Sequence, residues 1–467
     1  MVWALFSLCF CLGASGSTLP PLNHLKLHFR KRLVEEHADL FPTMAAVDRY
    51  LDNMNKLNRI QQKLHNFLSG ELEAGDGIER RETEHFAEMV ATAESQSPDQ
   101  LPYLFEGDIV LTDGQMDELL NNAYTQLEVM RRCSKGSDEK CGEQFDYKTL
   151  RKRTLTSNLR ERWNSFPIPY FVDPKVNRTA VEEGLANWMR STCLTFREVS
   201  SLGDSQAGLQ FVFGSGQVLG NPSKSSVLLI NSFSNNISCY SAIGKLDNGR
   251  PQKVSIGAAC DNPFVVSHEI AHSLGYFHEQ SRFDRNDFVR VQVKNIKSGF
   301  LNQFTSFSRS QENTFGVPAF SSSGLSSIQT LNSNYQNTIG QRFQLSFNDI
   351  KKMNLAYCDS LTDQQKTGIA IVPFPQRRAN DADVRMAPIG ARVALSFDSV
   401  RFVDANTPCQ KESYVEVRYR NDLGSVGARF CESDQKGSFV SESNEVIVLY
   451  RSASKQNSFG LRYQRNV

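Results

Sequence analysis

Histidine is scarce in this chain, and neither sign of charge is in clear excess. Only 8 of the 467 residues are His, and 52 Lys and Arg against 51 Asp and Glu leave a formal net charge of +1. A near-neutral chain lacks the basic surplus on which nucleic-acid binding depends, so no nucleic-acid partner is expected. No run of 18 apolar residues follows the first sixteen, so no membrane span is expected either.

The first sixteen residues are mostly apolar. They run from Met1 through the stretch Ala4 to Leu12 and end in the small residues Ala14-Ser15-Gly16. This pattern is typical of a secretory signal peptide that is cleaved after a small residue. We therefore expect residues 1–16 to be a signal peptide and the product to be secreted and extracellular.

Two of the ten cysteines lie within those first sixteen residues. The even number that remains, in an oxidising compartment, indicates four disulfides, although the sequence alone leaves their pairing open. The remaining eight are Cys133, Cys141, Cys193, Cys239, Cys260, Cys358, Cys409 and Cys431. Two Asn-x-Ser/Thr sequons, at Asn177 and Asn236, are candidate glycosylation sites.

Three of the eight histidines fall within one run of eleven residues, His268-Glu269-Ile270-Ala271-His272-Ser273-Leu274-Gly275-Tyr276-Phe277-His278. Positions i and i+4 share one face of a helix, so His268 and His272 can bind one metal ion. Gly275 can end the helix and turn the chain, because glycine readily takes a left-handed backbone. This turn would bring His278 to the same ion and leave a fourth position for water, which predicts a zinc site.

A carboxylate beside such a site is suited to general-base chemistry. Glu269 can take a proton from a zinc-polarised water and return it to a leaving amine. The alternative is that the histidines are satisfied within an ordinary helix, but the motif fixes five residues over eleven positions, which makes an accident rare. We expect one Zn²⁺ per chain on His268, His272 and His278, with Glu269 as catalytic base.

Hydrophobic periodicity predicts the elements around this motif. Alternation predicts sheet strands at residues 168–172, 209–213 and 227–230. A helical face carries Val181, Leu185, Trp188 and Met189, which are expected in the core. The motif helix is expected over residues 263–274, and a last helix is expected to begin at Ser346, where Asp349 completes a capping-box pattern.

The residues after His278 resemble the astacin family of zinc proteases, in which the third histidine is followed by E-x-x-R-x-D-R. Glu279, Arg282, Asp284 and Arg285 stand in that pattern, and Cys239-Tyr240-Ser241 upstream is also similar. Taken alone, the charges Arg282, Asp284, Arg285 and Asp287 indicate structural ion pairs rather than chemistry. The resemblance covers about residues 154–358. It implies an α+β fold, namely a two-lobed metzincin protease domain.

The same resemblance implies two disulfides in the protease domain, Cys193–Cys358 and Cys239–Cys260. Cys133–Cys141 and Cys409–Cys431 would then pair locally. In the chain-entropy view of disulfides, closing the long loop between residues 193 and 358 should stabilise the domain by roughly 4–5 kcal/mol.

Residues 17–153 are polar and indicate a helical prosegment. Apolar residues at helical spacing between positions 116 and 130 predict a helix that Thr112 can cap. The region ends in Arg151-Lys152-Arg153, a basic site, so we expect cleavage of the propeptide after Arg153.

Within this region, Phe105-Glu106-Gly107-Asp108-Ile109 resembles the F-x-G-D-I element of astacin propeptides. The resemblance implies that Asp108 binds the zinc of the latent zymogen in place of the catalytic water, and carboxylate oxygen is an acceptable zinc ligand. The alternative interpretation is an ordinary Gly-Asp turn.

Residues 359–467 change to the alternating pattern of half-buried strands, as in Val393-Leu395-Phe397 and Val415-Val417-Tyr419, which predicts a β-sandwich. With the cysteines at 409 and 431, this region resembles a CUB module, which implies binding of an extracellular protein partner. It departs from that pattern at Ala382 and Val384, where a cysteine and a tryptophan are common. Arg451 stands where calcium-binding versions place an aspartate, so no calcium site is expected.

One departure bears on activity. Astacins usually carry a downstream S-x-M-H-Y segment whose Met lies beneath the metal and whose Tyr stabilises the oxyanion. In this chain Asn313 and Phe315 stand in those positions, and no Met occurs between residues 287 and 352. Loss of one oxyanion donor typically costs roughly 10²–10³ in turnover.

Three functions therefore compete. The first is a secreted zinc endopeptidase, made as a zymogen, that hydrolyses extracellular protein or peptide substrates. The second is a catalytically impaired zinc-binding homologue that acts as an extracellular binding protein through its CUB-like domain. The third is a structural matrix protein with a relic site. The intact Glu269, Asp108 and basic cleavage site favour the first, whereas Asn313 and Phe315 favour the second.

Overall fold

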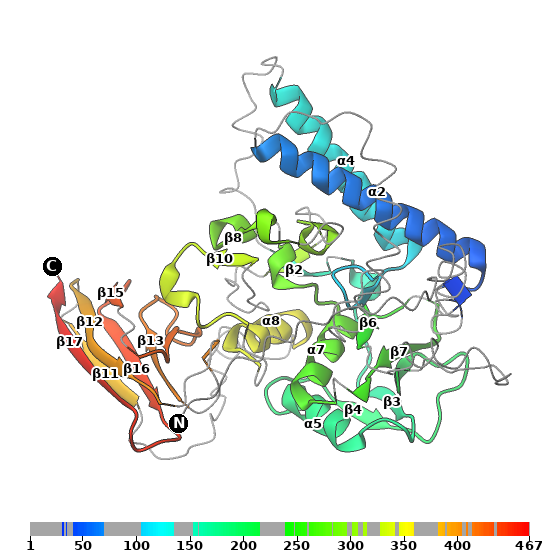
Figure 1. Cartoon of the computed structure of the whole chain (residues 1–467). Coiled ribbons are helices and arrows are strands. Elements are labelled where there is room, and N and C mark those ends of the chain that lie inside the picture. Colours follow the sequence, from blue (N-terminus) through cyan, green and yellow to red (C-terminus); the bar gives the residue numbers. More distant parts are fainter. Residues whose placement is uncertain are drawn as a thin grey trace, which may run out of the picture.

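A computed structural model describes residues 30–31, 34, 41–69, 104–134, 153–156, 158–214, 239–246, 248–258, 261–282, 284–296, 301–306, 312–314, 327–340, 345–358, 382–387, 390–403, 408–409, 413–433 and 437–466. Along the chain come the long helices α2 and α4, then a mixed sheet with its covering helices, then antiparallel C-terminal sheets (Figure 1). Among the helices in these stretches, none has both the length and the apolar character needed to cross a bilayer.

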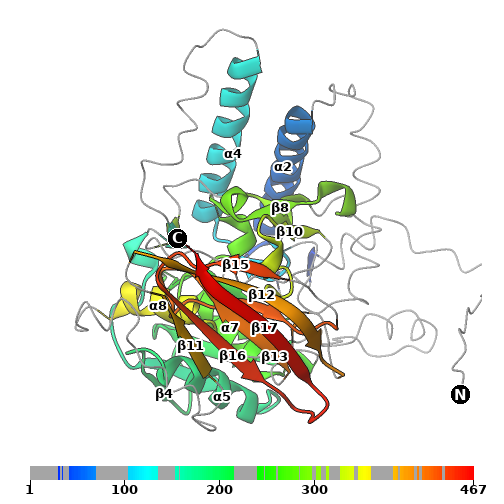
Figure 2. The ribbon, with the colours of Figure 1, turned by 90° about the vertical axis from the view of Figure 1, so that its left-hand side faces the viewer.

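Helices α2 (Met44–Ser69) and α4 (Asp113–Ser134) project from the central part of the molecule (Figure 2). Their buried side chains belong to one hydrophobic cluster, so the two helices share a packed face. Thr112 caps α4 as predicted. Its hydroxyl accepts a hydrogen bond from the Gln115 N–H at 3.3 Å, and the Gln115 side chain accepts one from the Thr112 N–H at 3.0 Å. This reciprocal pair satisfies backbone donors that a helix start otherwise leaves free.

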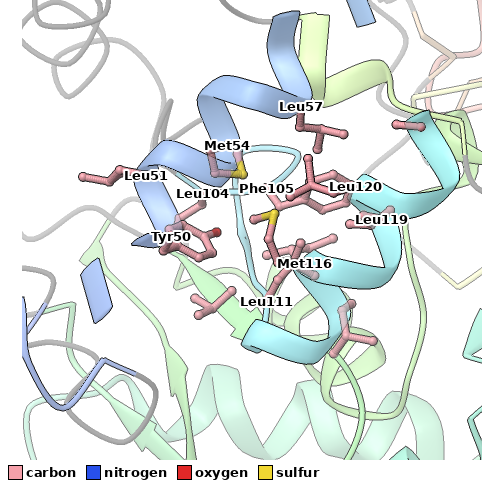
Figure 3. Close-up of a cluster of buried hydrophobic side chains, with 14 of the residues drawn as sticks. Tyr50, Leu51, Met54, Leu57, Leu104, Phe105, Leu111, Met116, Leu119 and Leu120 are labelled. Carbon is pink, nitrogen blue, oxygen red and sulfur yellow. The ribbon is translucent and has the colours of Figure 1, made fainter. Parts of the chain in front are cut away.

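The packed face of these helices forms one hydrophobic cluster with the segment between them. Leu104, Phe105 and Leu111 of that segment lie among side chains of α2 and α4 (Figure 3). Tyr240, Ile243 and Phe277, which come from the central part of the chain, belong to the same cluster. The N-terminal helices are therefore anchored beside the histidine motif, since Phe277 directly precedes His278.

The central sheet has the strand order β1-β6-β7-β5-β3-β4. Neighbouring strands run parallel except for β6 and β7, which are antiparallel, so β1 and β6 run opposite to the other four strands. The strands are β1 (Ile109–Val110), β3 (Ile168–Val172), β4 (Phe196–Glu198), β5 (Gly208–Val212), β6 (Tyr240–Ala242) and β7 (Pro251–Ser255). Edge strand β1 therefore comes from the segment between the two long helices, and it adds to the sheet through β6.

Helices α5 (Arg178–Met189) and α7 (Pro263–Ser273) share the hydrophobic cluster of this sheet. They pack closely because a Cβ at Gly184 would lie only 2.7 Å from Val266. Two buried indoles fix α7 along its length: Trp188 donates to the Ser267 carbonyl at 2.9 Å, and Trp163 donates to the Ser273 carbonyl at 2.8 Å. The helix that carries the histidines is thus held by packing and by hydrogen bonds.

Shorter elements lie between α4 and β3 and after α7. Strand β2 pairs with β9, and β8 pairs with β10, both antiparallel. These elements are β2 (Arg153–Thr156), η2 (Leu159–Glu161), η4 (Glu279–Ser281), η5 (Arg285–Asp287), β8 (Val289–Val291), η6 (Val293–Asn295), η7 (Leu301–Phe304), β9 (Glu312–Thr314), β10 (Ile328–Thr330), η8 (Ser333–Tyr335) and α8 (Phe347–Tyr357). The predicted capping box at the start of α8 is present, with Ser346 and Asp349 bonded reciprocally.

Two of the four expected disulfides lie in the described part of the chain. Cys193 is bonded to Cys358, which ties the end of α5 to the end of α8, and Cys409 is bonded to Cys431. Cys239 is also disulfide-bonded, but Cys260 lies outside the described residues. For the expected pair Cys133–Cys141, the side chain of Cys133 and the whole of Cys141 lie outside them as well.

The C-terminal strands form two sheets of order β11-β16-β13-β14 and β15-β12-β17, whose buried side chains share one cluster. The strands are β11 (Ala382–Met386), β12 (Arg392–Arg401), β13 (Tyr414–Arg418), β14 (Ala428–Phe430), β15 (Ser438–Val440), β16 (Glu445–Arg451) and β17 (Ser458–Asn466). All neighbouring pairs are antiparallel. The alternating burial expected from the sequence is seen in β12, whereas β13 is buried on both faces, with Tyr414 and Glu416 as covered as Val415 and Val417.

The C-terminal sheets and the central part share side chains. Tyr335, from η8, is fully buried in the cluster of the C-terminal sheets. Next to it, the Asn332 amide donates to the Tyr419 hydroxyl at 2.7 Å, and the Arg429 N–H donates to the Thr338 hydroxyl at 2.9 Å. Residues 327–340, which include β10 and η8, thus connect β8 of the central part to the C-terminal sheets.

The position of Met189 differs from the prediction. Met189 was expected in the core with the rest of its helical face, but its side chain is 39% exposed. It is the last residue of α5 and does not belong to the hydrophobic cluster that contains Val181, Leu185 and Trp188. The strand predicted at residues 227–230 lies outside the described residues.

Replacement of Tyr335 by Ala is expected to destabilise the C-terminal sheets. A buried aromatic side chain lost from a packed core typically costs about 3–5 kcal/mol. Leu331→Ala serves as the control, because Leu331 lies in the same segment and is 51% exposed. Hydrogen exchange of strands β12 and β13 in the full chain measures the effect. Equal protection in both variants would show that Tyr335 does not hold the two parts together.

Glu416 is expected to make the C-terminal sheets acid-sensitive. Burial raises its pKa, but the charges of Arg429 and Arg418 and the Gly427 N–H outweigh burial and lower the pKa to about 2. A depressed pKa gives stability that is complete above the unfolded value of about 4.5 and is lost as the pH falls toward about 2. Its size is on the order of 3 kcal/mol.

Glu416→Gln should remove this acid dependence, and it should also destabilise the fold at neutral pH because Arg429 then lacks its buried partner. Exchange protection of β13 between pH 5 and pH 2.5, within the window of about 4.5 to 2, tests this. Glu442→Gln is the control, since Glu442 forms a half-exposed pair with Arg420. Unchanged acid sensitivity in Glu416→Gln would contradict the assignment.

Candidate metal centre

The structure brings His268, His272, His278 and Asp108 together. One potential ligand atom from each lies within 4.8 Å of all the others. The three imidazoles come from α7 and the turn after it, whereas Asp108 comes from the segment between α2 and α4, 160 residues earlier than His268. Both sequence motifs therefore meet in one cluster.

Helix α7 sets the spacing of the first two histidines. It begins after Asn262, whose side chain accepts the Phe264 N–H at 2.8 Å, with Pro263 as the first helical residue. Proline is favoured at this position because its missing N–H would have no partner there. Along the regular helix that follows, His268 and His272 lie one turn apart on one face.

The third histidine is placed by a turn at Gly275. This residue has a φ of 99°, a conformation that L-residues with a Cβ avoid, so the turn needs glycine. The Gly275 N–H donates to the His272 carbonyl at 2.8 Å, and the Gly275 carbonyl accepts the Thr156 N–H at 2.8 Å. The predicted role of Gly275 is therefore visible: it ends the helix and directs the chain so that His278 returns to the cluster.

The spacing of the imidazoles fits a tetrahedral metal. Nε2 of His268 is 3.0 Å from Nε2 of His272 and 3.2 Å from Nε2 of His278. Zinc–nitrogen bonds of about 2.0–2.1 Å in a tetrahedron place ligand nitrogens roughly 3.3 Å apart. The contact between His272 Nδ1 and the Tyr276 carbonyl, 2.7 Å, leaves Nε2 of that ring directed at the cluster. Three imidazoles and a carboxylate form a donor set suited to Zn²⁺.

Asp108 reaches the cluster from a tight loop, the 105–109 hairpin, defined by the antiparallel bridge between Phe105 and Ile109. Glu106 and Gly107 both have positive φ there, 54° and 97°. Asp108 Oδ2 lies 3.1 Å from Nε2 of His268 and 3.2 Å from Nε2 of His278. The loop is more than the plain Gly-Asp turn that the sequence left as an alternative, because it projects its carboxylate into the three imidazoles.

The protein groups shift one another's protonation in opposite directions. Burial raises the pKa of Asp108, but the charge of His278 and hydrogen bonds from all three histidines outweigh it and hold the pKa well below its usual value. The atoms packed around His268, and then the charge of His272, lower its pKa to about 4, although part of the ring remains accessible. At neutral pH the ring of His268 is therefore uncharged and offers a lone pair to a metal.

Glu106 is a further site residue that the sequence analysis did not single out. Its side chain is fully buried, and Oε2 lies 2.9 Å from Nδ1 of His278. Burial raises its pKa, partly offset by His278. Because Glu106 occupies the unspecified position of F-x-G-D-I, only its contact with His278 reveals it.

Glu269 follows His268 on α7 and is fully buried. Of the two residues that depart from the family pattern, Asn313 lies in β9, where its backbone is paired opposite Leu155 of β2, and Phe315 lies outside the described residues. Arg153, the expected cleavage residue, is at the start of β2, opposite Thr314.

Of the charges expected to form structural ion pairs, Arg282 and Asp284 do so in a buried network, whereas Arg285 donates to the backbone carbonyls of Gln280 and Phe304 and Asp287 is exposed. Arg282 is fully buried and bonds Asp284 through two nitrogens, at 2.7 and 2.9 Å, and Glu279 at 3.0 Å. Lys352 of α8 completes the network by binding Glu279. The burial of Lys352 was not predicted from the sequence, because nothing in the residue pattern of α8 indicates a buried charge. The network fixes the residue next to His278 to α8.

Of the two candidate glycosylation sites, only Asn177 lies in the described part of the chain. Asn177 is exposed and caps α5, where its side-chain oxygen accepts the Ala180 N–H at 3.3 Å. Asn236 lies outside the described residues.

The chain is similar in sequence to known proteins. A family model described as Astacin, a peptidase family, matches residues 219–358. Zinc metalloproteinase nas-34 of Caenorhabditis elegans is 32% identical over 476 residues, which cover 89% of this chain and 71% of that protein. Blastula protease 10 of Paracentrotus lividus is 26% identical over 77% of this chain and 64% of its own length.

A solved structure, High choriolytic enzyme 1, a hatching enzyme zinc-protease from Oryzias latipes, aligns with 41% of this chain and 88% of its own at 24% identity and a TM-score of 0.32. The identity to nas-34 across most of the chain, together with the family model over the histidine motif, shows that the chain belongs to the astacin family of peptidases.

Proposed function

We propose that this protein is a secreted zinc-dependent endopeptidase that is made as a latent zymogen and hydrolyses extracellular proteins or peptides. The observation that carries the proposal is the convergence of three imidazole nitrogens and the Asp108 carboxylate at metal-binding distances. Membership of the astacin family supports the reaction class.

In this proposal His268, His272 and His278 hold one Zn²⁺ per chain, and Asp108 is the fourth ligand of the latent form. Bound zinc would polarise a water molecule and the scissile carbonyl. Glu269 then accepts the proton of that water and passes it to the leaving amine. Its place on α7 directly after His268, where it is fully buried, supports this role.

The proposed organisation is a signal peptide over residues 1–16, a propeptide over 17–153, a metalloprotease domain over 154–358 and a CUB-like domain over 359–467. The shared cluster of α2, α4 and Phe277 supports a propeptide seated at the active site. Pairing of β1 with β6 supports it too, because both flank the position of Asp108. Cleavage after Arg153 would separate Asp108 from the histidines.

Secretion is supported by the disulfides Cys193–Cys358 and Cys409–Cys431, since such bonds persist in oxidising compartments. Cys239–Cys260 and Cys133–Cys141 are the remaining proposed pairs, and Asn177 and Asn236 the proposed glycosylation sites. The antiparallel C-terminal sheets support the CUB-like assignment and its proposed role in binding an extracellular protein partner.

Protein processed after Arg153 is expected to cleave casein or a quenched peptide. Glu269→Ala should lower turnover by about 10²–10⁴, because a general base is lost while the three imidazoles remain. Glu183→Ala, exposed on α5, is the matched control. Zinc content is measured beside turnover, and a chelator should abolish cleavage in the wild type.

The competing function predicts a different result. A processed protein that retains one zinc per chain but cleaves no substrate would support the impaired homologue, in which Asn313 and Phe315 have removed activity. Phe315→Tyr should then raise turnover by roughly 10²–10³ if the missing hydroxyl is responsible. Zinc far below one per chain would instead support a structural protein with a relic site.

A further inference from the structure

The 105–109 hairpin contacts both ring nitrogens of His278. Asp108 Oδ2 lies 3.2 Å from Nε2, and Glu106 Oε2 lies 2.9 Å from Nδ1 of the same ring. The intervening Gly107 lets the two side chains approach the imidazole from different sides, since its φ of 97° folds the hairpin back on itself. The ring of His278 therefore lies between two carboxylates of one loop.

The conformation of Glu106 is costly in two respects. Its φ of 54° makes it the sole non-glycine residue with positive φ among the described residues, and a side chain with a Cβ disfavours that backbone. Its carboxylate is also fully buried, which is unfavourable without a partner. Strained backbone persists only where the surroundings enforce it, and it is concentrated at functional sites, which favours a functional role for Glu106.

The hairpin itself is held firmly. Phe105 is fully buried in the cluster shared by α2 and α4 (Figure 3), and the backbones of Phe105 and Ile109 exchange two hydrogen bonds of 3.0 Å. The Ser241 N–H of β6 donates to the Asp108 carbonyl at 3.1 Å. The Glu106 carboxylate is therefore delivered to His278 by a fixed scaffold and does not depend on a mobile side chain finding its place.

We propose that Glu106 is a positioning residue of the latent form, which holds His278 through Nδ1 so that Nε2 faces the metal, and that the zymogen consequently retains zinc longer than the processed protein does. This inference rests on the proposed function, in which His278 binds zinc and residues 17–153 are removed. A carboxylate at the second nitrogen of a ligating histidine fixes its tautomer and its orientation.

Charge balance gives a second reason. Three neutral imidazoles leave the two charges of Zn²⁺ uncompensated in a largely buried site, whereas the 105–109 hairpin brings two carboxyl groups, those of Asp108 and Glu106, to the ring of His278. Removal of the hairpin takes both carboxylates away at once. The prosegment thus does more than block the site: it supplies the fourth ligand and also the partner that orients the third.

Zinc release from the uncleaved full chain tests the proposal. Zinc-loaded zymogen is mixed with a chromophoric chelator at neutral pH, and the rate of transfer is recorded for wild type, Glu106→Gln and Glu106→Gly. Both variants are expected to lose zinc about 10–100-fold faster than wild type, because mutation of the residue that orients a ligating histidine typically weakens metal affinity by about that factor. Glu118→Gln, the same change at an exposed position of α4, should leave the rate unaltered.

Glu106→Gly separates positioning from folding. Glycine tolerates positive φ, so this variant relieves the strained backbone while it removes the carboxylate. A zymogen that unfolds no more easily than wild type and yet loses zinc faster supports the positioning role. A variant that keeps zinc as long as wild type overturns it.

Processing supplies an internal control. After cleavage at Arg153 and removal of residues 17–153, every Glu106 variant yields the same polypeptide as wild type, so the release rates must then coincide, and they should exceed that of the wild-type zymogen. Asp108→Asn shows whether the proposed site is loaded at all. If wild type binds no zinc, the proposed function fails; if Asp108→Asn releases zinc fast while Glu106→Gln matches wild type, only this inference fails.

Discussion

The turn at Gly275 is the constraint on which the cluster of candidate metal ligands depends. A helix alone can align His268 and His272, but a third ligand needs the chain to reverse within a few residues, and a φ of 99° makes that reversal possible. The turn is held from both sides, by the His272 carbonyl and by Thr156. Because Trp163 and Trp188 fix α7 itself, the helix and the turn together set the positions of the three imidazoles.

Around this scaffold the charged groups are buried in compensated sets. The 105–109 hairpin brings Asp108 and Glu106 against the histidines, and on the other side of His278 the network of Glu279, Arg282 and Lys352 ties the chain to α8. Single buried charges would be unfavourable, whereas sets that alternate in sign satisfy one another. The two sets meet at His278, so the position of its ring depends on both of them.

The sequence predicts what is local. The spacing of the histidines, the capping boxes at Thr112 and at Ser346, and the alternating strands each follow from a period or a short pattern that a few neighbours determine. The Asp108 contact was reachable only through the resemblance of F-x-G-D-I to a family element. Residues 160 positions apart carry no shared period, so no pattern in one segment indicates the other.

Residues with unusual environments could not be found this way. Glu106 looks like any acidic loop residue, and its left-handed backbone arises from the hairpin that Phe105 and Ile109 close. Lys352 stands in an amphipathic helix beside Lys351, yet one lysine is buried against Glu279 and the other is bonded to Asp422 at the edge of the C-terminal sheets. Which of two adjacent lysines is buried depends on the rotation of α8, and tertiary packing sets that rotation.

The junction with the C-terminal sheets has a consequence for the site. Strand β10, within residues 327–340, pairs with β8, and β8 follows the turn at Gly275, His278 and η5 along the chain. The same segment places Tyr335 inside the core of the C-terminal sheets. Lys351 adds a second tie from α8, the helix whose next residue binds Glu279. A domain joined only by a flexible linker could be lost without effect on the central part. Here removal of the C-terminal sheets would expose Tyr335 and would leave β8 and α8, which support His278, without their contacts to these sheets. The C-terminal sheets are therefore structurally part of the unit that holds the three histidines.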